Sequence, residues 1–260
     1  MARERLDRVL VERGLAESRE RAQALILAGA VTVDGQIARR AAAPVGPEAR
    51  VELAARLPYV SRGGLKLERA LDAFDLDVRD LTLADVGAST GGFTDCLLQR
   101  GAARVYAIDV GRGQLDWRLR QDPRVVVMER THARGLERLP EPVDAAVADL
   151  SFISLRQVLP SVFGWLRPGG WVVALVKPQF EAGRRQVGRG GVVRDPAVHA
   201  QVLRDVAAAV AERGRRVVAV TASPITGPAG NREFLVEVRP DGSRPGEELE
   251  EQIARAVERC

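Results

Sequence analysis

The chain has 260 residues, of which 46% are hydrophobic and 28% charged, the composition of an ordinary soluble globular protein. No run approaches the roughly 18 apolar residues that span a bilayer, and the N-terminus lacks the apolar core of a signal peptide, so we expect a cytoplasmic protein. The net charge of +4 admits a polyanionic partner but is too small to identify one. Cys96 and Cys260 lack the spacing of a disulfide framework or a metal site, so we expect neither.

The first fifty or so residues predict a small α+β unit. Apolar residues recur at helical spacing in two segments, and Gly14 separates them. Asp34-Gly35 between two short apolar runs indicates a tight hairpin turn. The segment from Ala41 to Pro47 reads as a loop. The expected elements are helices over residues 5–13 and from Ser18 onward, and strands near residues 30–33 and 50–53.

This unit also carries many arginines. Acidic residues are interleaved with them, so from charge alone a solvated helical surface is as good a reading as an RNA contact. The stretch RLDRVLVERGLAESRERAQALILAGAVTVDG, however, resembles the RNA-binding domain named after small-subunit ribosomal protein S-four along its whole length. The resemblance implies RNA binding. The candidate RNA-binding residues are Arg3, Arg5, Arg8, Arg19 and Arg21, with Arg39 and Arg40 in the following segment.

A linker is expected next, because Pro58 disfavours a continuous helix through residues 54–59. We therefore expect an RNA-binding domain at 1–57, a linker at 58–63 and a second domain at 64–260.

From Leu81 onward, apolar and β-branched runs alternate with helical segments. The runs show little polar alternation, as expected for strands covered on both faces. The fold class predicted is α/β, a Rossmann-like doubly wound sheet with an antiparallel pair among its last strands, preceded by the small α+β domain. The expected strands are 82–86, 104–109, 125–129, 145–149, 170–177, 216–223 and 233–239.

Residues 85–95, DVGASTGGFTD, read as a strand end, a glycine turn and a helix start, the pattern of a nucleotide-type cofactor loop. Asp109 ends the next strand about twenty residues later, where a carboxylate can accept hydrogen bonds from ribose hydroxyls. This pairing fits a dinucleotide or S-adenosylmethionine. The loop is not G-x-G-x-x-G, since Ser89 stands at the second glycine position, and a dehydrogenase is therefore disfavoured.

Four charged residues far apart in the sequence are placed to meet at one site: Lys66, Asp149, Lys177 and Glu233. Burial and a second ammonium nearby both favour the uncharged form of a lysine, which can then act as a general base. Taken singly, each of the four has an ordinary structural reading, as a strand-end lysine, a helix cap or half of an ion pair.

The motifs GASTGGFTD, YAIDVG, ADLSFISL, LVKPQFE, GRGGVVRDP and GPAGNREFL together resemble the TlyA family of rRNA ribose methyltransferases, some members of which are labelled haemolysins. The second domain is similar to FtsJ-type 2′-O-methyltransferases, whose Lys-Asp-Lys-Glu tetrad matches the four residues above. The resemblance implies that Lys177 is the base and that Asp149 orients its amine. Lys66 would favour the uncharged amine and hold the target, and Glu233 would fix Lys66 or the ribose.

The same resemblance implies S-adenosylmethionine as cofactor, no metal, and a ribose of ribosomal RNA, on a cytidine, as the target within a ribosomal subunit or ribosome. Relatives carry Arg-x-Trp-Val before SRG where this chain has Arg56-Leu-Pro-Tyr-Val60, which leaves the coupling between the domains open. The candidate cofactor-binding residues are Ser61, Gly87, Ala88, Ser89, Thr90, Gly91, Gly92, Phe93, Asp109, Glu129, Arg130 and Asp149.

Two other functions stay open at this point. A non-catalytic rRNA-binding assembly factor with a vestigial second domain is the main alternative, although the complete tetrad argues against it. A membrane-damaging protein is disfavoured by the lack of a spanning or pore-forming segment. The stretch from Glu181 to Asp195, rich in arginine and glycine, is a candidate lid over bound RNA or an ordinary surface loop. Trp117, Trp165 and Trp171 are expected to pack in the core or against helices rather than to stack on bases.

Overall fold

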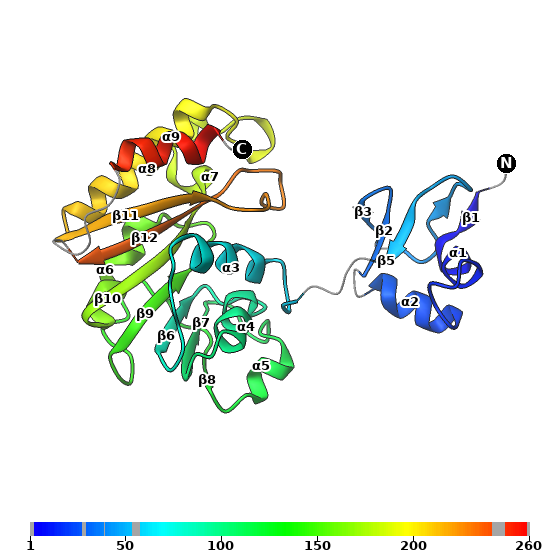
Figure 1. The fold of residues 1–260 in the computed structure, drawn as a ribbon, viewed down its shortest axis with the longest axis horizontal. Helices are drawn as coiled ribbons and strands as arrows, with labels where there is room; N and C mark the ends of the chain where they lie inside the picture. The colour runs from blue at the N-terminus through cyan, green and yellow to red at the C-terminus, as the bar shows by residue number, and fades with distance from the viewer. Residues whose placement is uncertain (1–2, 28–29, 39, 54–57, 241–247, 259–260) are drawn as a thin grey trace. The chain divides into compact units, whose positions relative to one another are not determined.

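The computed structural model describes residues 3–27, 30–38, 40–53, 58–240 and 248–258, and divides into two compact units, Met1–Pro58 and Tyr59–Cys260 (Figure 1). Arg39, residues 54–57 before the predicted linker and Cys260 lie outside the described residues.

The first unit packs two helices against short strands. Ser18 Oγ accepts a hydrogen bond from the Arg21 amide at 3.1 Å, so the second helix has the predicted cap. Asp34 and Gly35 adopt φ values of 51° and 79°, which confirms the tight turn. The elements are α1 (Leu6–Glu12), α2 (Arg19–Leu27) and the strands β2 (Val31–Val33), β3 (Gln36–Ile37) and β5 (Val51–Leu53), which form one sheet in the order β3-β2-β5.

The expectation of a plain loop over residues 41–47 is wrong. Residues Pro44–Val45 form a strand, β4, which pairs antiparallel with β1 (Glu4–Arg5). Val45 is buried in the small core of this unit, beside Leu6 and Leu10. The gain from burying Val45, together with the backbone pairing, therefore outweighs the turn-forming tendency of the neighbouring prolines and glycine.

The second unit is built on a seven-stranded sheet in the order β11-β12-β10-β9-β6-β7-β8. The strand pairs are parallel except that β12 runs antiparallel to both β10 and β11. This confirms the Rossmann-like fold class and the antiparallel pair. The strands are β6 (Thr82–Val86), β7 (Arg104–Ile108), β8 (Val125–Met128), β9 (Val143–Ala148), β10 (Leu166–Val176), β11 (Arg215–Ala222) and β12 (Phe234–Pro240).

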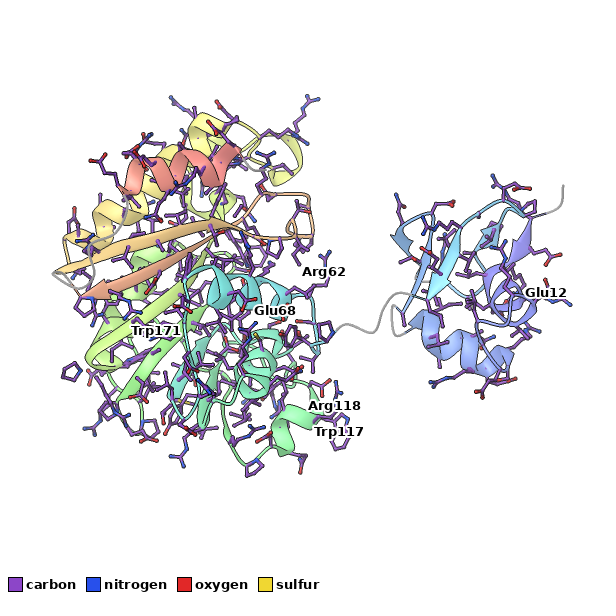
Figure 2. The ribbon with its side chains drawn as sticks, in the orientation of Figure 1. Glu12, Arg62, Glu68, Trp117, Arg118 and Trp171 are labelled. Carbon is purple, nitrogen blue, oxygen red and sulfur yellow. The ribbon has the colours of Figure 1, made fainter. Side chains whose placement is uncertain are left out.

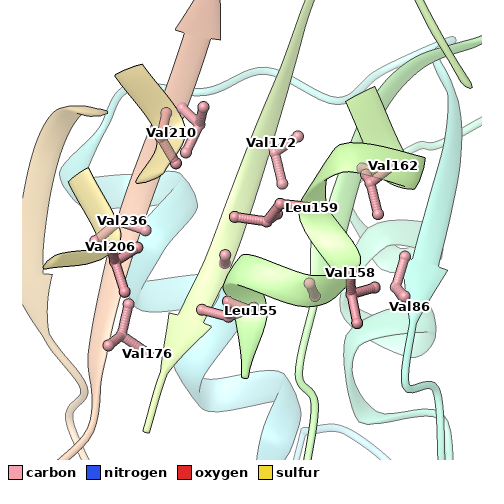
Figure 3. Packing of buried hydrophobic residues seen from close by; sticks show 14 of the residues in the cluster. Val86, Leu155, Val158, Leu159, Val162, Val172, Val176, Val206, Val210 and Val236 are labelled. Carbon is pink, nitrogen blue, oxygen red and sulfur yellow. The ribbon is translucent and has the colours of Figure 1, made fainter. Parts of the chain in front are cut away.

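Helices cover both faces of this sheet, each face with its own apolar core. On one face, Leu155 and Val162 of α6 and Val206 of α8 pack against strand residues such as Val172 and Val236 (Figure 3). Each such side chain, fully buried, contributes about 1.5–3 kcal/mol. The helices are α3 (Gly63–Ala73), α4 (Gly92–Gln99), α5 (Trp117–Gln121), α6 (Leu155–Trp165), α7 (Pro178–Glu181), α8 (Pro196–Ala211) and α9 (Leu249–Glu258).

Two of the three tryptophans are buried as expected. Trp165 is 2% and Trp171 7% exposed, but Trp117 at the start of α5 is 71% exposed, so the core expectation is wrong for that residue (Figure 2). Throughout the described ranges, we find no helix with the length and apolarity needed to cross a membrane.

Candidate active site

The carboxyl ends of the parallel strands bring the predicted residues to one edge of the sheet. Gly87 follows β6, Asp109 follows β7, Asp149 follows β9 and Lys177 follows β10. Because β12 is antiparallel to β10, its first residue Phe234 pairs with Val176, and Glu233 therefore lies at the same edge. The strand order reverses between β6 and β9, the place where open α/β sheets bind ligands.

The glycine loop has backbone demands that other residues do not meet. Gly87 has a φ of 90°, and a Cβ there would lie 2.5 Å from the carbonyl oxygen of Asp149. A Cβ on Gly92, the first residue of α4, would lie 2.3 Å from Ser61 Oγ. The loop after β6 thus approaches Asp149 and the segment before α3 closely only because these positions lack side chains. The predicted Ser61 lies beside the loop.

Asp109 holds the loop region together with both carboxylate oxygens. Its Oδ2 accepts a hydrogen bond from the Ser89 amide at 2.8 Å, and its Oδ1 accepts one from the Gly111 amide at 2.6 Å. The next residue, Val110, is 59% exposed and offers an apolar surface. A half-buried carboxylate that accepts hydrogen bonds, a tight glycine turn and an exposed apolar side chain together fit a nucleoside-bearing cofactor.

The remaining predicted cofactor residues differ in what they offer. Thr90 is exposed and Ala88 buried, and Arg130 is exposed with a φ of 52°. Phe93 is 3% exposed and packs in the core under the loop, so only its backbone is available to a ligand. Glu129 pairs with Arg120 and accepts a hydrogen bond from the Gly113 amide at 2.7 Å, so its carboxylate already supports the neighbouring loop.

Asp85 is a residue that the sequence reading left without a role. It is fully buried at the end of β6, and Thr94 Oγ1 donates a hydrogen bond to its Oδ2 at 2.6 Å. Its Oδ1 has no hydrogen-bond partner among the described residues. Burial raises the pKa of Asp85 to about 7, against the hydrogen bond from Thr94. The signal in the sequence was a single carboxylate inside the apolar run LADVGA.

The four tetrad residues form two ion pairs. Lys66 Nζ of α3 lies 2.5 Å from Glu233 Oε2, and both side chains are buried. Lys177 Nζ lies 2.6 Å from Asp149 Oδ1 and donates a hydrogen bond to Ser151 Oγ at 2.9 Å. A Cβ on Gly227 would come within 2.6 Å of Glu233 Oε1, so the glycine leaves room for that carboxylate. The backbone of Asp149 contacts the glycine loop, so the Lys177–Asp149 pair adjoins that loop.

The segment after Asp149 contributes further residues that the sequence reading did not assign. Phe152 is 92% exposed, has a φ of 65° and lies with its ring centroid 5.2 Å from that of Phe180. A non-glycine residue at positive φ is strained, and such strain recurs at functional sites. Glu181 accepts hydrogen bonds from Ser154 Oγ and the Leu155 amide, both at 2.6 Å, and so ties this segment to the one carrying Lys177. Both segments belong to motifs quoted from the sequence, ADLSFISL and LVKPQFE, but the motifs alone assigned no role to Phe152, Phe180 or Glu181.

Among the predicted RNA-binding arginines of the first unit, those that the structure describes are exposed, but two are also structural. Arg5 and Arg19 pair with the fully buried Asp7, at 2.9 Å and 3.1 Å. Hydrogen bonds from Arg5 above all, and also from Gln23 and Arg19, lower the pKa of Asp7 against the effect of burial. Arg3, Arg8 and Arg21 form no ion pair with any residue that the structure describes.

The sheet order, the glycine loop and the two lysine–carboxylate pairs at one edge of the sheet together define a methyltransferase of the Rossmann-like class. Comparison with known families agrees: the model of the FtsJ-like methyltransferase matches residues 59–239, and that of the S4 domain matches residues 4–51. The chain belongs to the FtsJ-like methyltransferase family, and the resemblance stated from the motifs is confirmed.

Full-length relatives share both parts. The chain is 49% identical over 261 residues to the 16S/23S rRNA (cytidine-2′-O)-methyltransferase TlyA of Mycobacterium tuberculosis, covering 98% of this chain and 97% of that one. It is 41% identical over 234 residues to Hemolysin A of Brachyspira hyodysenteriae, covering 89% and 98%. A solved structure named as a hemolysin of Streptococcus thermophilus is 43% identical with a TM-score of 0.78, covering 100% of this chain and 96% of that one.

Proposed function

We propose that this enzyme transfers the methyl group of S-adenosylmethionine to the 2′-hydroxyl of a cytidine ribose in ribosomal RNA. The observation that carries the proposal is the Lys177–Asp149 pair, which adjoins the glycine loop through the backbone of Asp149. The 49% identity to a named rRNA cytidine 2′-O-methyltransferase supports the substrate. Ribosomal subunits are cytoplasmic, so the proposal includes a cytoplasmic site of action.

The residues present fit the cofactor. The loop Gly87 to Phe93 would cradle it with backbone groups and Asp109 would accept from its ribose hydroxyls. When bound, S-adenosylmethionine supplies a methyl group on a positively charged sulfur, with a neutral thioether as leaving group. Methyl transfer of this kind needs a positioned and deprotonated oxygen more than an elaborate relay.

Each tetrad residue has a role in that positioning. Lys177 takes the proton of the 2′-hydroxyl at Nζ as the ribose oxygen is methylated. Asp149 and Ser151 aim that amine. Glu233 fixes Lys66, whose ammonium holds the ribose or its phosphate. The exposed ring of Phe152, next to Ser151, suits stacking of a nucleobase.

We further assign the division of labour between the parts of the chain. Residues 1–57 dock on rRNA, residues 58–63 link, and residues 64–260 carry the chemistry. The S4-domain match and the exposed arginines of the first unit support this assignment.

The test is transfer of tritium from methyl-labelled cofactor to isolated ribosomal subunits, followed by mapping of the modified ribose. Incorporation that depends on Lys177 and appears at a cytidine 2′-oxygen supports the proposal. Tight rRNA binding without any incorporation would favour a non-catalytic assembly factor instead.

A further inference from the structure

A positively charged loop adjoins the tetrad. Between α7 and α8, residues 184–194 carry exposed arginines that form no ion pair within the described part of the chain; we call this segment the arginine loop. The acids beside it are already engaged. Glu181 faces Ser154 and the Leu155 amide, and Asp195 caps α8 by accepting from the Ala197 amide at 2.9 Å. The arginines are Arg184, Arg185, Arg189 and Arg194.

Buried side chains fix the path of the arginine loop. Asn231 is 2% exposed; its Oδ1 accepts from the Val193 amide at 3.0 Å and its Nδ2 donates to the Gly191 carbonyl at 2.9 Å. His199, fully buried on α8, donates from Nε2 to the Val193 carbonyl at 3.0 Å. Both backbone groups of Val193 are thus satisfied by side chains from elsewhere, and losing such a partner in the interior is costly. The end of the arginine loop, at residues 191–193, is therefore held in place.

The same asparagine connects the arginine loop to the tetrad. Asn231 stands two residues before Glu233, on the β11–β12 connection that Figure 1 shows beside the loop between α7 and α8. The Asn231 carbonyl accepts from the Gly227 amide at 2.8 Å, and Gly227 is the residue that leaves room for the Glu233 carboxylate. Asn231 therefore links the arginines on one side with the Lys66–Glu233 pair on the other.

We propose that the arginine loop is a fixed phosphate-binding surface for the RNA strand that carries the target ribose. Asn231 is the positioning residue that holds this surface in register with the Lys66–Glu233 pair. The inference rests on the proposed function and names a second RNA contact, on the catalytic unit itself. Unpaired guanidinium groups are suited to phosphate because they donate in a planar fork and stay charged. A fixed surface of this kind differs from a lid that closes over bound RNA.

The first experiment removes the charges. The variant Arg184→Ala, Arg185→Ala, Arg189→Ala is compared with Arg79→Ala, Arg204→Ala, Arg213→Ala, which loses the same charge at exposed positions elsewhere. Binding to ribosomal subunits is measured across a salt series. Each lost phosphate contact lowers the slope of log affinity against log salt by about 0.7–0.9. We expect a shallower slope by about 2 and a KM for subunits raised at least tenfold, with cofactor affinity unchanged. The control keeps the wild-type slope.

Equal slopes for the wild type and the loop variant would overturn the inference while leaving the methyltransferase proposal intact. A failure of the proposed function gives a different result. In that case the wild-type protein binds subunits but does not methylate them, and the salt slopes of the wild type and the loop variant still show whether the arginines contact phosphate.

The second experiment tests Asn231 by a double-mutant cycle. Asn231→Ala is made in the wild type and in the loop triple variant, and the salt slope is measured in both. If Asn231 acts through the arginines, Asn231→Ala should lower the slope clearly in the wild type and much less in the triple variant, where Arg194 is the loop arginine that remains. The same loss in both backgrounds would show a merely structural role and overturn the positioning assignment. If Asn231→Ala does not fold, His199→Phe replaces it in the cycle, because it removes the hydrogen bond to the Val193 carbonyl in the same loop.

Discussion

Each unit of this chain buries an aspartate completely, and the surroundings of the two aspartates have opposite effects on the pKa. Asp7 of the first unit is surrounded by Arg5, Arg19 and Gln23, and the hydrogen bonds from these side chains lower its pKa. Asp85 of the second unit receives one side-chain hydrogen bond, from Thr94, and burial raises its pKa to about 7. In the small first unit, the buried carboxylate of Asp7 holds several side chains together. In the larger second unit, the buried carboxylate of Asp85 is unfavourable in its charged form and lies beside the candidate active site.

Three other buried charges of the second unit lie beside Asp85 in the same part of the fold, at the carboxyl ends of the parallel strands. Lys66, Lys177 and Glu233 are each less than a tenth exposed, and all lie at the edge where the cofactor loop ends. Buried ion pairs contribute little net stability compared with apolar residues of similar size. We therefore infer that these charges are kept for the reaction, and the predictions below test that contrast.

The largest effect is expected for Lys177→Ala. Removing the amine paired with Asp149 should lower the rate of methyl transfer by about 10²–10⁴-fold, the usual contribution of a general base. Cofactor affinity should stay nearly unchanged, because the glycine loop and Asp109 remain. Single-turnover methylation and calorimetry measure the two quantities. A normal rate would remove Lys177 from the proposed mechanism.

Asp109→Ala should show the reverse pattern. Loss of the charge-assisted hydrogen bonds to the cofactor ribose, each about 1.5–3 kcal/mol, should weaken cofactor binding at least tenfold. Because Asp109 also holds the Ser89 and Gly111 amides, Asp109→Asn is the matched variant that keeps the side-chain shape. Calorimetric titration with the cofactor decides the matter: unchanged affinity in both variants would place the cofactor elsewhere.

Much of this site could be predicted because parallel strands end at a common edge. The apolar runs marked every strand of the large sheet to within a few residues, and the chain order then fixed which polar residues meet there. The contacts of Asn231 with Gly191 and Val193 could not be predicted, because they join loops about forty residues apart and no periodic pattern links them. The same holds for the pairing of Arg5 and Arg19 with Asp7, which gives two of the candidate RNA contacts a structural role.

That pairing changes how the RNA contacts of the first unit should be tested. Alanine at Arg5 or Arg19 leaves a buried carboxylate short of partners, so a loss of binding would also report unfolding. Arg3→Ala, Arg8→Ala, Arg21→Ala is the cleaner variant. We expect its slope of log affinity against log salt to fall by about 0.7–0.9 for each lost phosphate contact. Hydrogen exchange in α1 and α2 should match the wild type. An unchanged slope would assign the RNA contacts to the arginine loop alone.

The smallest effect, and the most direct test of the comparison, is the pH dependence of Asp85→Asn. The pKa of Asp85 is raised in the folded state, so between about pH 4 and pH 7 the folded chain binds a proton that the unfolded chain has released. Stability from this group therefore falls as the pH rises through that window and stays low above it. Asparagine keeps the shape and can still accept from Thr94, but it does not titrate. We expect the variant and the wild type to melt at similar temperatures at pH 5, and the variant to melt higher at pH 8.

Asp77→Asn is the control, because Arg79 lowers the pKa of that exposed carboxyl to about 2 and leaves nothing to titrate in the window. If the difference in melting temperature between Asp85→Asn and the wild type is the same at both pH values, Asp85 is not an unfavourable buried charge, and the contrast with Asp7 fails.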